Sequence, residues 1–302
     1  MTAASIAPTP ARALPAFPMK ALQALLPTAF AEDEGAGDIT SEATLDAGDR
    51  SKGALLCKED GVLAGLPLME AVFRHRGLAP RLEWLVHEGD AIYAGQILAR
   101  LEGETRGLLV CERIILNFMQ RLCGIATVAR EYALAAAPTR VLDTRKTLPA
   151  YRELDKYAVA VGGGMNHRMG LHDQILIKDN HAAACGSVRA AVDHAAARFG
   201  RAYRIEAEVR TLDEIETLLD SQVDILLLDN MNDKTLKAAV TRVRAAAPHI
   251  QLEASGNLDL ARVKKLRNIG LDFFSVGALT HSVKALDLSL KIGFFVPGGT
   301  HG

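Results

Sequence analysis

Residues 139–281 contain six short apolar runs that alternate with segments of helical periodicity, and this alternation restricts the fold more than any other feature. Apolar strands separated by helices form a parallel sheet whose faces the helices cover. Six such units predict an α/β barrel or a near-barrel. Pro149 and Ser187 suit first helical turns, and Gly200 and Gly270 suit helix stops. The strand-like runs are 140–143, 174–178, 204–209, 224–229, 250–255 and 272–277, and the helical segments are 148–161, 187–199, 212–220, 233–246 and 260–269.

Polar side chains or glycines follow nearly every one of these strands at its carboxyl end. In an α/β barrel the carboxyl ends of the strands form the rim of the active site. Glu206 and Glu208 are two residues apart, so they lie on one face of their strand. We therefore expect the polar residues to face one opening. They are Arg145, Lys146, Lys178, Glu206, Glu208, Asp229, Asn230, Glu253, Ser255, Gly256, Asn257, Ser275 and Gly277.

Five side chains that can carry positive charge lie close to three consecutive glycines at 162–164. They are Arg145, Lys146, His167, Arg168 and Lys178. Each one alone is best explained as an ordinary solvated charge, because most Lys and Arg side chains are exposed. Five of them beside strand ends and glycine breaks instead favour convergence on one cavity. Such a cavity suits a highly anionic small molecule.

Small residues after the last two strands, at 255–257 and at 277–278, offer free backbone N–H groups near helix starts. Loops in these positions of a barrel commonly hold a phosphate. Glu208 and Asp229 suit a hard cation, because Mg²⁺ prefers one or two carboxylates plus substrate phosphates. They could also form a general acid–base pair, or be neutralised by the cationic cluster. Lys178 at a strand end could alternatively form a Schiff base, as in barrel aldolases.

The first part of the chain shows a different pattern of strands and helices. Residues 53–66 and 84–102 predict short strands joined by tight turns, and residues 68–76 and 111–136 predict helices. An acidic, glycine-containing loop is expected at 33–44. Gly124 would let the long helix pack closely or bend.

The strands at 84–102 are similar to the β framework of biotin and lipoate carrier domains. Such a carrier needs a lysine at a hairpin tip, and this stretch has none. The segment is therefore interpreted as part of a structural β-sandwich.

The composition of the 302 residues argues against several classes of partner. The formal net charge is −1, so no global basic field would recruit nucleic acid or a membrane surface. The four cysteines form no C-x-x-C pair, which fits a reducing, cytoplasmic setting. No apolar run reaches membrane-spanning length. The first eighteen or so residues are interpreted as a loose tail and not as a signal peptide.

Long motifs in one order give the chain its resemblance to a known family. They begin with Glu112-Arg113 and Leu116-Asn117-Phe118, and continue with the segments at 143–147, 162–168, 177–181, 206–209, 228–230, 253–257 and 275–282. In this order they resemble quinolinate phosphoribosyltransferase, also called nicotinate-nucleotide diphosphorylase (carboxylating). The resemblance covers almost everything from about residue 31 onward.

The resemblance implies an α/β fold in which an N-terminal α/β sandwich domain is joined to an open seven-stranded α/β barrel. The implied divisions are a loose tail with the first helix at 1–30, the sandwich domain at 31–124 and the catalytic barrel at 125–284. A C-terminal segment at 285–302 would return to the N-terminal domain. The implied enzyme is a pentosyltransferase of NAD biosynthesis. It would convert quinolinate and 5-phosphoribosyl-1-diphosphate, with Mg²⁺, into nicotinate mononucleotide, diphosphate and CO₂.

The resemblance also implies a role for each matching residue. Substrate-binding residues would be Arg113, Thr144, Arg145, Lys146, His167, Arg168, Lys178, Glu208, Asp229, Ser255, Gly256, Asn257, Val276, Gly277 and Ala278. Catalytic roles would belong to Lys146, Lys178, Glu208 and Asp229. Glu208 and Asp229 would also hold Mg²⁺ through diphosphate or water. A homodimer, or a higher assembly, would bring Arg113 into the partner's active site.

One rival keeps the fold and changes the acceptor, as in relatives associated with molybdenum transport. The set of Arg113, Arg145, Lys146, His167 and Arg168 favours a dicarboxylate acceptor over that alternative, because arginine forks match carboxylates.

Overall fold

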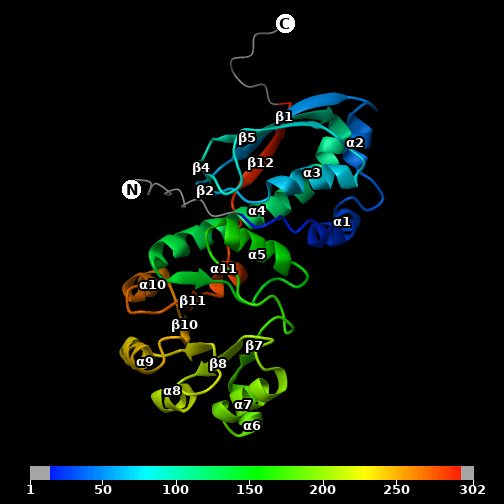
Figure 1. Cartoon of the computed structure of the whole chain (residues 1–302). Helices are drawn as coiled ribbons and strands as arrows, with labels where there is room; N and C mark the ends of the chain where they lie inside the picture. Colours follow the sequence, from blue (N-terminus) through cyan, green and yellow to red (C-terminus); the bar gives the residue numbers. More distant parts are fainter. Residues whose placement is uncertain (1–13, 294–302) are drawn as a thin grey trace. The chain divides into compact units, whose positions relative to one another are not determined.

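A computed structural model describes residues 14–293, which divide into two compact units (Figure 1). The first unit takes its described residues from 14–130, 148–163 and 282–293, and the second consists of 131–147 and 164–281. Helix α4 (Thr105–Ala136) begins in the first unit and ends in the second. No helix within the described residues is long and apolar enough to cross a membrane.

The first unit contains a four-stranded antiparallel sheet in the order β12-β1-β5-β3. Gly89 and Gly95 both adopt φ +83°, a conformation that favours glycine, at the tight turns before and after β4. The strands and turns expected at 53–66 and 84–102 are confirmed. The strand bounds are β1 (Arg50–Cys57), β3 (Arg81–Trp84), β5 (Ile97–Glu104) and β12 (Leu288–Ile292), with a separate pair of β2 (Gly61–Val62) and β4 (Ala91–Ile92).

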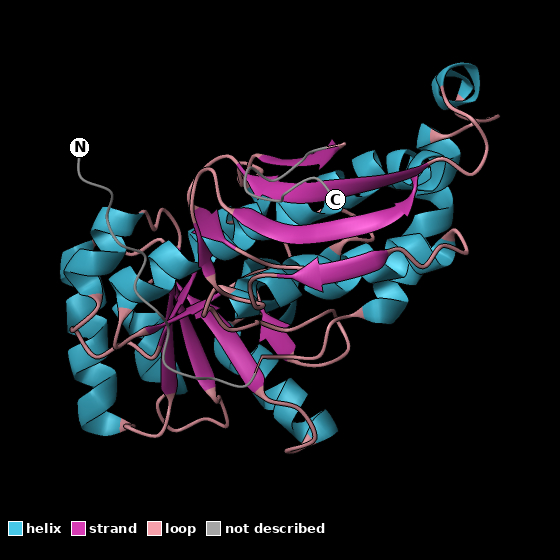
Figure 2. Cartoon of the chain, turned by 90° about the horizontal axis from the view of Figure 1, so that it is seen from above, coloured by secondary structure: helices cyan, strands magenta, loops and turns pink. Residues whose placement is uncertain are grey.

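Helices complete the first unit, and Figure 2 shows the long strands of its sheet lying over them. Gly124 lies in α4 where a Cβ atom would overlap the carbonyl oxygen of Lys284. The expected close packing of the long helix is therefore present. The other helices of this unit are α1 (Met19–Asp33), α2 (Ile39–Thr44), α3 (Leu66–His75) and α5 (Arg152–Val161).

The second unit is built on a six-stranded parallel sheet in the order β6-β11-β10-β9-β8-β7. Helices surround its strands (Figure 2), so apolar side chains on both faces are buried, as in Leu226–Leu228. The strand bounds are β6 (Arg140–Leu142), β7 (Ile175–Ile177), β8 (Ile205–Val209), β9 (Ile225–Asp229), β10 (Gln251–Ser255) and β11 (Phe273–Ser275). The helices are α6 (Asp179–Cys185), α7 (Val188–Phe199), α8 (Leu212–Leu218), α9 (Asp233–Ala246), α10 (Leu260–Leu266) and α11 (Ala278–His281).

A single bridge at Met165 takes the place of a seventh strand. Met165 pairs in parallel with Leu142 of β6, and its N–H donates to the carbonyl of Val141. Among the described residues no pairing joins Met165 to β7. The α/β class and the open sheet agree with expectation, while the seventh strand is reduced to this bridge.

Three sequence-based predictions of local structure are wrong in detail. The loop expected at 33–44 contains α2, because the Asp38 carboxylate caps it by accepting the N–H groups of Thr40 and Ser41. Pro149 does not begin a helix, since α5 starts at Arg152. The long helix α4 begins at Thr105 and not at residue 111.

Candidate functional site

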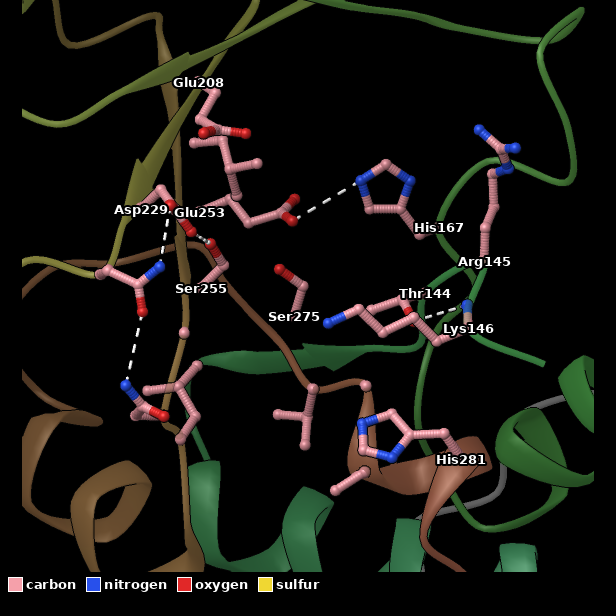
Figure 3. A pocket seen from close by; sticks show the side chains of 18 of the residues that line it. Thr144, Arg145, Lys146, His167, Glu208, Asp229, Glu253, Ser255, Ser275 and His281 are labelled. Atoms are coloured by element: carbon pink, nitrogen blue, oxygen red, sulfur yellow. Dashed lines mark hydrogen bonds and ion pairs between the residues drawn. The ribbon is translucent and has the colours of Figure 1, made fainter. Parts of the chain in front are cut away.

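One cavity of about 800 Å³ opens at the carboxyl ends of the parallel strands of the second unit. All of its lining residues belong to that unit. The cavity is half-enclosed and combines acidic, basic and backbone groups (Figure 3). This composition suits a small, highly charged ligand.

The expectation that Glu206 faces the opening is wrong, because its carboxylate is fully buried against Gln174 and His167 and does not line this cavity. The substrate-binding residues that the resemblance implies in the second unit all line it. These residues are Thr144, Arg145, Lys146, His167, Arg168, Lys178, Glu208, Asp229, Ser255, Gly256, Asn257, Val276, Gly277 and Ala278. Arg113 is different, because it lies exposed on α4 of the first unit.

Asp143 positions the loop that carries His167 and Arg168. It follows β6, and its carboxylate is fully buried. It accepts the side-chain amide of Asn166 at 2.7 Å and the backbone N–H of His167 at 2.8 Å. A buried carboxylate needs such donors. The residue after the strand therefore fixes the loop at 166–168 beside Arg145.

Two arginines, Arg145 and Arg168, line the cavity close enough for their charges to act on each other. Burial first, and then the charge of Arg145, lower the pKa of Arg168. Arg168 donates one N–H to the carbonyl of Gln174 at 3.2 Å, while its buried Nε has no hydrogen-bond partner among the described residues. Like charges held together in a partly desolvated site favour a bound anion with more than one negative charge.

His167 is held between a backbone donor and two buried carboxylates. Its Nδ1 accepts the backbone N–H of Arg168 at 2.7 Å, which favours the tautomer with the proton on Nε2. Nε2 lies 3.1 Å from Glu206 and 3.6 Å from Glu253. The ring is thus directed toward these two carboxylates.

Glu208 and Asp229 lie together on the neighbouring strands β8 and β9. Burial first, and then the charge of Asp229, raise the pKa of Glu208. Arg210 bridges them, with its guanidinium 2.9 Å from Glu208 and 3.6 Å from Asp229. The same guanidinium lies 3.2 Å from Asp179. The carboxylate pair therefore attracts positive charge and already holds one side-chain cation.

The loop after β10 has a strained, closely packed backbone. Gly256 has φ +85°, and a Cβ atom there would overlap the side-chain amide of Asn230. Asn230 and Asn257 are non-glycine residues with φ +53° and +50°. Outliers of this kind cluster at binding sites, where the surrounding structure holds them. The Ser255 hydroxyl donates to Asp229 at 2.7 Å, which ties this loop to the carboxylate pair.

Backbone donors are available at two places on the cavity wall. Within the described chain, the N–H groups of Gly256, Asn257, Gly277 and Ala278 have no protein acceptor. The N–H of Val276 is different, because it donates to the carbonyl of Leu142. Of the second expected loop, only 277–278 can therefore offer backbone donors to a ligand.

Several lining residues had no role implied by the resemblance. Glu253, Ser275 and Asn230 stand at strand ends and line the cavity, as the strand-end rule predicted. His281 ends α11 and lies against Gly277, and nothing in the local sequence pattern singled it out. The full set of additional lining residues is Tyr132, Leu176, Leu227, Asn230, Glu253, Leu258, Asp259, Ser275 and His281.

Two family models together match most of the chain. The model for "Quinolinate phosphoribosyl transferase, N-terminal domain" matches residues 38–123. The model for "Quinolinate phosphoribosyl transferase, C-terminal domain" matches residues 125–291.

Curated proteins similar to the chain come from plants and from a cyanobacterium. "Quinolinate phosphoribosyltransferase [decarboxylating] 2b, mitochondrial" of Nicotiana tabacum is 40% identical over 297 residues, covering 92% of this chain and 84% of that protein. "Probable nicotinate-nucleotide pyrophosphorylase [carboxylating]" of Synechocystis is 40% identical over 265 residues, covering 87% and 90%.

Solved structures agree with the sequence matches. NadC from Streptococcus pyogenes superposes with a TM-score of 0.85 at 38% identity, covering 91% of this chain and 98% of that chain. The nicotinate-nucleotide pyrophosphorylase of Francisella tularensis gives a TM-score of 0.84 at 35% identity, covering 91% and 97%. With both domain models matched and relatives of this identity along its length, the chain belongs to the quinolinate phosphoribosyltransferase family.

Proposed function

We propose that this protein transfers the phosphoribosyl group of 5-phosphoribosyl-1-diphosphate to quinolinate and releases CO₂, forming nicotinate mononucleotide for NAD biosynthesis. The observation that carries this proposal is that one cavity is lined by Arg145 and Arg168, whose charges act on each other, and by the carboxylate pair of Glu208 and Asp229. Such a cavity suits a dianionic acceptor at one end and a metal-bound diphosphate donor at the other.

The arginine end is the proposed site for quinolinate. Two planar guanidinium groups match two carboxylates, since each can donate a pair of N–H groups. Lys146 and Lys178 line the same cavity as exposed side chains. They would neutralise carboxylate and phosphate charge as the substrates meet. Thr144 supports Lys146, because its hydroxyl accepts the N–H of Lys146 at 3.1 Å.

The proposed site for the 5′-phosphate lies on the loops after β10 and β11. The available N–H groups of Gly256, Asn257, Gly277 and Ala278 would donate to its oxygens. Backbone donors bind an anion with little loss of conformational entropy, because the fold already fixes them.

Glu208 and Asp229 fit a hard divalent cation. Their carboxylates repel each other and are only partly offset by Arg210 and Lys178. A Mg²⁺ ion held through water or diphosphate would relieve that repulsion. When bound, it would supply positive charge to the departing diphosphate. The chain's own contribution is to hold the two carboxylates on adjacent strands and to place the ribose next to them.

The proposed chemistry needs alignment and charge stabilisation more than a covalent nucleophile. Diphosphate leaves the ribose C1, where positive charge develops, and the pyridine nitrogen attacks that carbon. The resulting pyridinium stabilises the electron pair that remains on the ring when the adjacent carboxylate leaves as CO₂. Fixed cations and carboxylates that face these charges lower the barrier without reorganising during the reaction.

The proposed active unit is a homodimer or a higher assembly in which Arg113 reaches the partner's cavity. The exposure of Arg113 on α4 supports this part of the proposal. A cytoplasmic location is also proposed, since the four cysteines are free thiols in the described chain. Several curated plant relatives, by contrast, carry names that place them in organelles.

Incubation with quinolinate, the ribosyl donor and Mg²⁺ tests the reaction, with nicotinate mononucleotide detected by mass and NMR. The proposal expects product only when all three are present. Donor consumption with a different acceptor and none with quinolinate would instead favour the molybdenum-associated relatives. Borohydride trapping of a carbonyl substrate on Lys178 would favour a Schiff-base aldolase.

A further inference from the structure

Two fully buried carboxylates, Glu206 on β8 and Glu253 on β10, lie 3.1 and 3.6 Å from Nε2 of His167. The His167 side chain and these carboxylates place their ligand-type atoms within 4.8 Å of one another. The phosphoribosyl transfer described above uses neither glutamate. Buried groups of this kind are costly to retain, so their arrangement requires an explanation.

The tautomer of His167 argues against a metal ion in this cluster. A metal on Nε2 would leave the ring proton on Nδ1. That proton would face the backbone N–H of Arg168, which now donates to Nδ1 at 2.7 Å. Two N–H groups that face each other cannot form a hydrogen bond. The cluster is therefore better explained as a group of side chains that binds a proton and not a metal ion.

The two carboxylates differ in their surroundings. Glu206 accepts the side-chain amide of Gln174 at 2.5 Å and lies closer to His167, so donors stabilise its charge. Neither carboxyl oxygen of Glu253 forms a hydrogen bond of normal geometry among the described residues, and only Ser275 and the more distant His167 act on it as donors. Two carboxylates sharing one site cannot both ionise easily, and the one with fewer donors keeps the proton.

Burial, followed by the charge of Glu206, raises the pKa of Glu253 to about 8, against 4.5 for an ordinary glutamate. This increase in the pKa of Glu253 is offset only in part by His167, Ser275 and Arg204. The residues paired with Glu253 on the adjacent strands, Leu227 and Phe273, carry no charge. Near neutral pH, Glu253 is therefore a neutral carboxylic acid.

Only Glu253 of the two faces the substrate cavity. It lines the cavity, while Glu206 lies behind it and does not. Figure 3 shows the Glu253 carboxyl pointing toward His167, on the strand that ends in Ser255. The acid thus lies between the proposed arginine site and the proposed phosphate loop. The ring carbon beside the pyridine nitrogen has to lie between these same two sites.

We propose that Glu253 is the general acid that protonates ring carbon 2 of the substrate after its carboxylate leaves as CO₂. This inference rests on the proposed function. The C2–carboxylate bond breaks and its electron pair stays on C2. That pair takes the proton from the Glu253 hydroxyl, and Glu253 becomes a carboxylate beside the His167 N–H. Glu253 regains a proton from water once the product leaves.

The test is a single-turnover experiment on Glu253→Gln, which keeps the size of the side chain but has no acidic proton. Diphosphate release reports ribosyl transfer, and mononucleotide formation reports completion of the reaction. We expect the second rate to fall by about 100-fold or more, the usual contribution of a general acid, while diphosphate release stays within about threefold of the parent. Glu83→Gln, the same change at an exposed position on β3, should leave both rates unchanged.

An unchanged rate of mononucleotide formation in Glu253→Gln would overturn the proposal. An equal loss of both rates would also overturn it, because Glu253 would then act before CO₂ leaves. A parent protein that forms no mononucleotide would refute the proposed function itself.

Two measurements keep the test valid if Glu253→Gln does not fold. In the parent, mononucleotide formation relative to diphosphate release should fall as pH rises through the pKa of Glu253, about 8. In Glu206→Gln that decline should move to lower pH, because removing the neighbouring negative charge makes Glu253 easier to ionise. A ratio that does not depend on pH in the parent would contradict the assignment.

Discussion

The protonation of Glu253 contributes to the stability of the fold. Its pKa is raised from 4.5 to about 8, so the folded state binds a proton that the unfolded state has lost in that pH range. Stability from the neutral, buried acid is present below the unfolded pKa and is lost as pH rises through the folded pKa. Glu253→Gln does not ionise. Its melting temperature relative to the parent should therefore rise between about pH 5 and about pH 8. A difference that stays constant or falls would show that Glu253 is ionised throughout.

Arg210 would compete with the proposed Mg²⁺ for the Glu208–Asp229 pair. Its guanidinium lies 2.9 Å from Glu208 and 3.6 Å from Asp229, and its side chain is half exposed. Removing this cation leaves the carboxylates with more negative potential. We expect Arg210→Ala to bind Mg²⁺ more tightly in the absence of substrates, by calorimetric titration. Arg201→Ala, which removes an exposed arginine paired with Asp224, is the control. Weaker binding in Arg210→Ala would mean that the pair is not the metal site.

At the scale of elements, helix α4 depends on close contact at Gly124. A Cβ atom there would overlap the carbonyl oxygen of Lys284 and touch Val283. Because backbone cannot move as easily as a side chain, Gly124→Ala should destabilise the fold by about 1–3 kcal/mol in denaturant unfolding. Asn117→Ala, at an exposed position of the same helix, should change stability little. Equal stability of Gly124→Ala and the parent would show that the segment at 283–285 is not held against the helix.

The alternation of apolar runs predicted the elements of the parallel sheet because each strand is buried on both faces. The run at 224–229 became β9, and the helical pattern at 233–246 became α9 with the same bounds. Short helices were harder to predict. Neither α6 nor α11 is long enough to show a periodic apolar face. Their positions depend on the strand ends that precede them.

The candidate site was predictable to the extent that strand ends determine it. Lys178, Asp229 and Ser255 lie at carboxyl ends of parallel strands, and such ends meet at one edge of a sheet. The state of His167 was not predictable, because it depends on one backbone hydrogen bond within a loop. The division of roles between Glu206 and Glu253 likewise depends on which carboxylate receives the Gln174 amide.

At the scale of the whole molecule, the proposed exchange of Arg113 between subunits predicts complementation. Arg113→Ala and Lys178→Ala should each be inactive alone. When the two are unfolded and refolded together, half of the dimers are mixed and each has one intact site, so activity should recover to about one quarter of the parent. The control mixes Lys178→Ala with Arg189→Ala, a variant at a surface position, and measures the activity that refolding with such a variant gives. Parental activity in Arg113→Ala alone, or no recovery on mixing, would contradict the shared site.

Arg145 and Arg168 are proposed to hold a dicarboxylate whose decarboxylation is coupled to ribosyl transfer. The most direct measurement supplies quinolinate labelled in its C2 carboxylate, with the ribosyl donor and Mg²⁺, to the parent and to Arg145→Ala. The account predicts one labelled CO₂ for each diphosphate and each mononucleotide in the parent. It predicts no labelled CO₂ from Arg145→Ala, at an unchanged melting temperature. Labelled CO₂ from Arg145→Ala at the parental rate would contradict it.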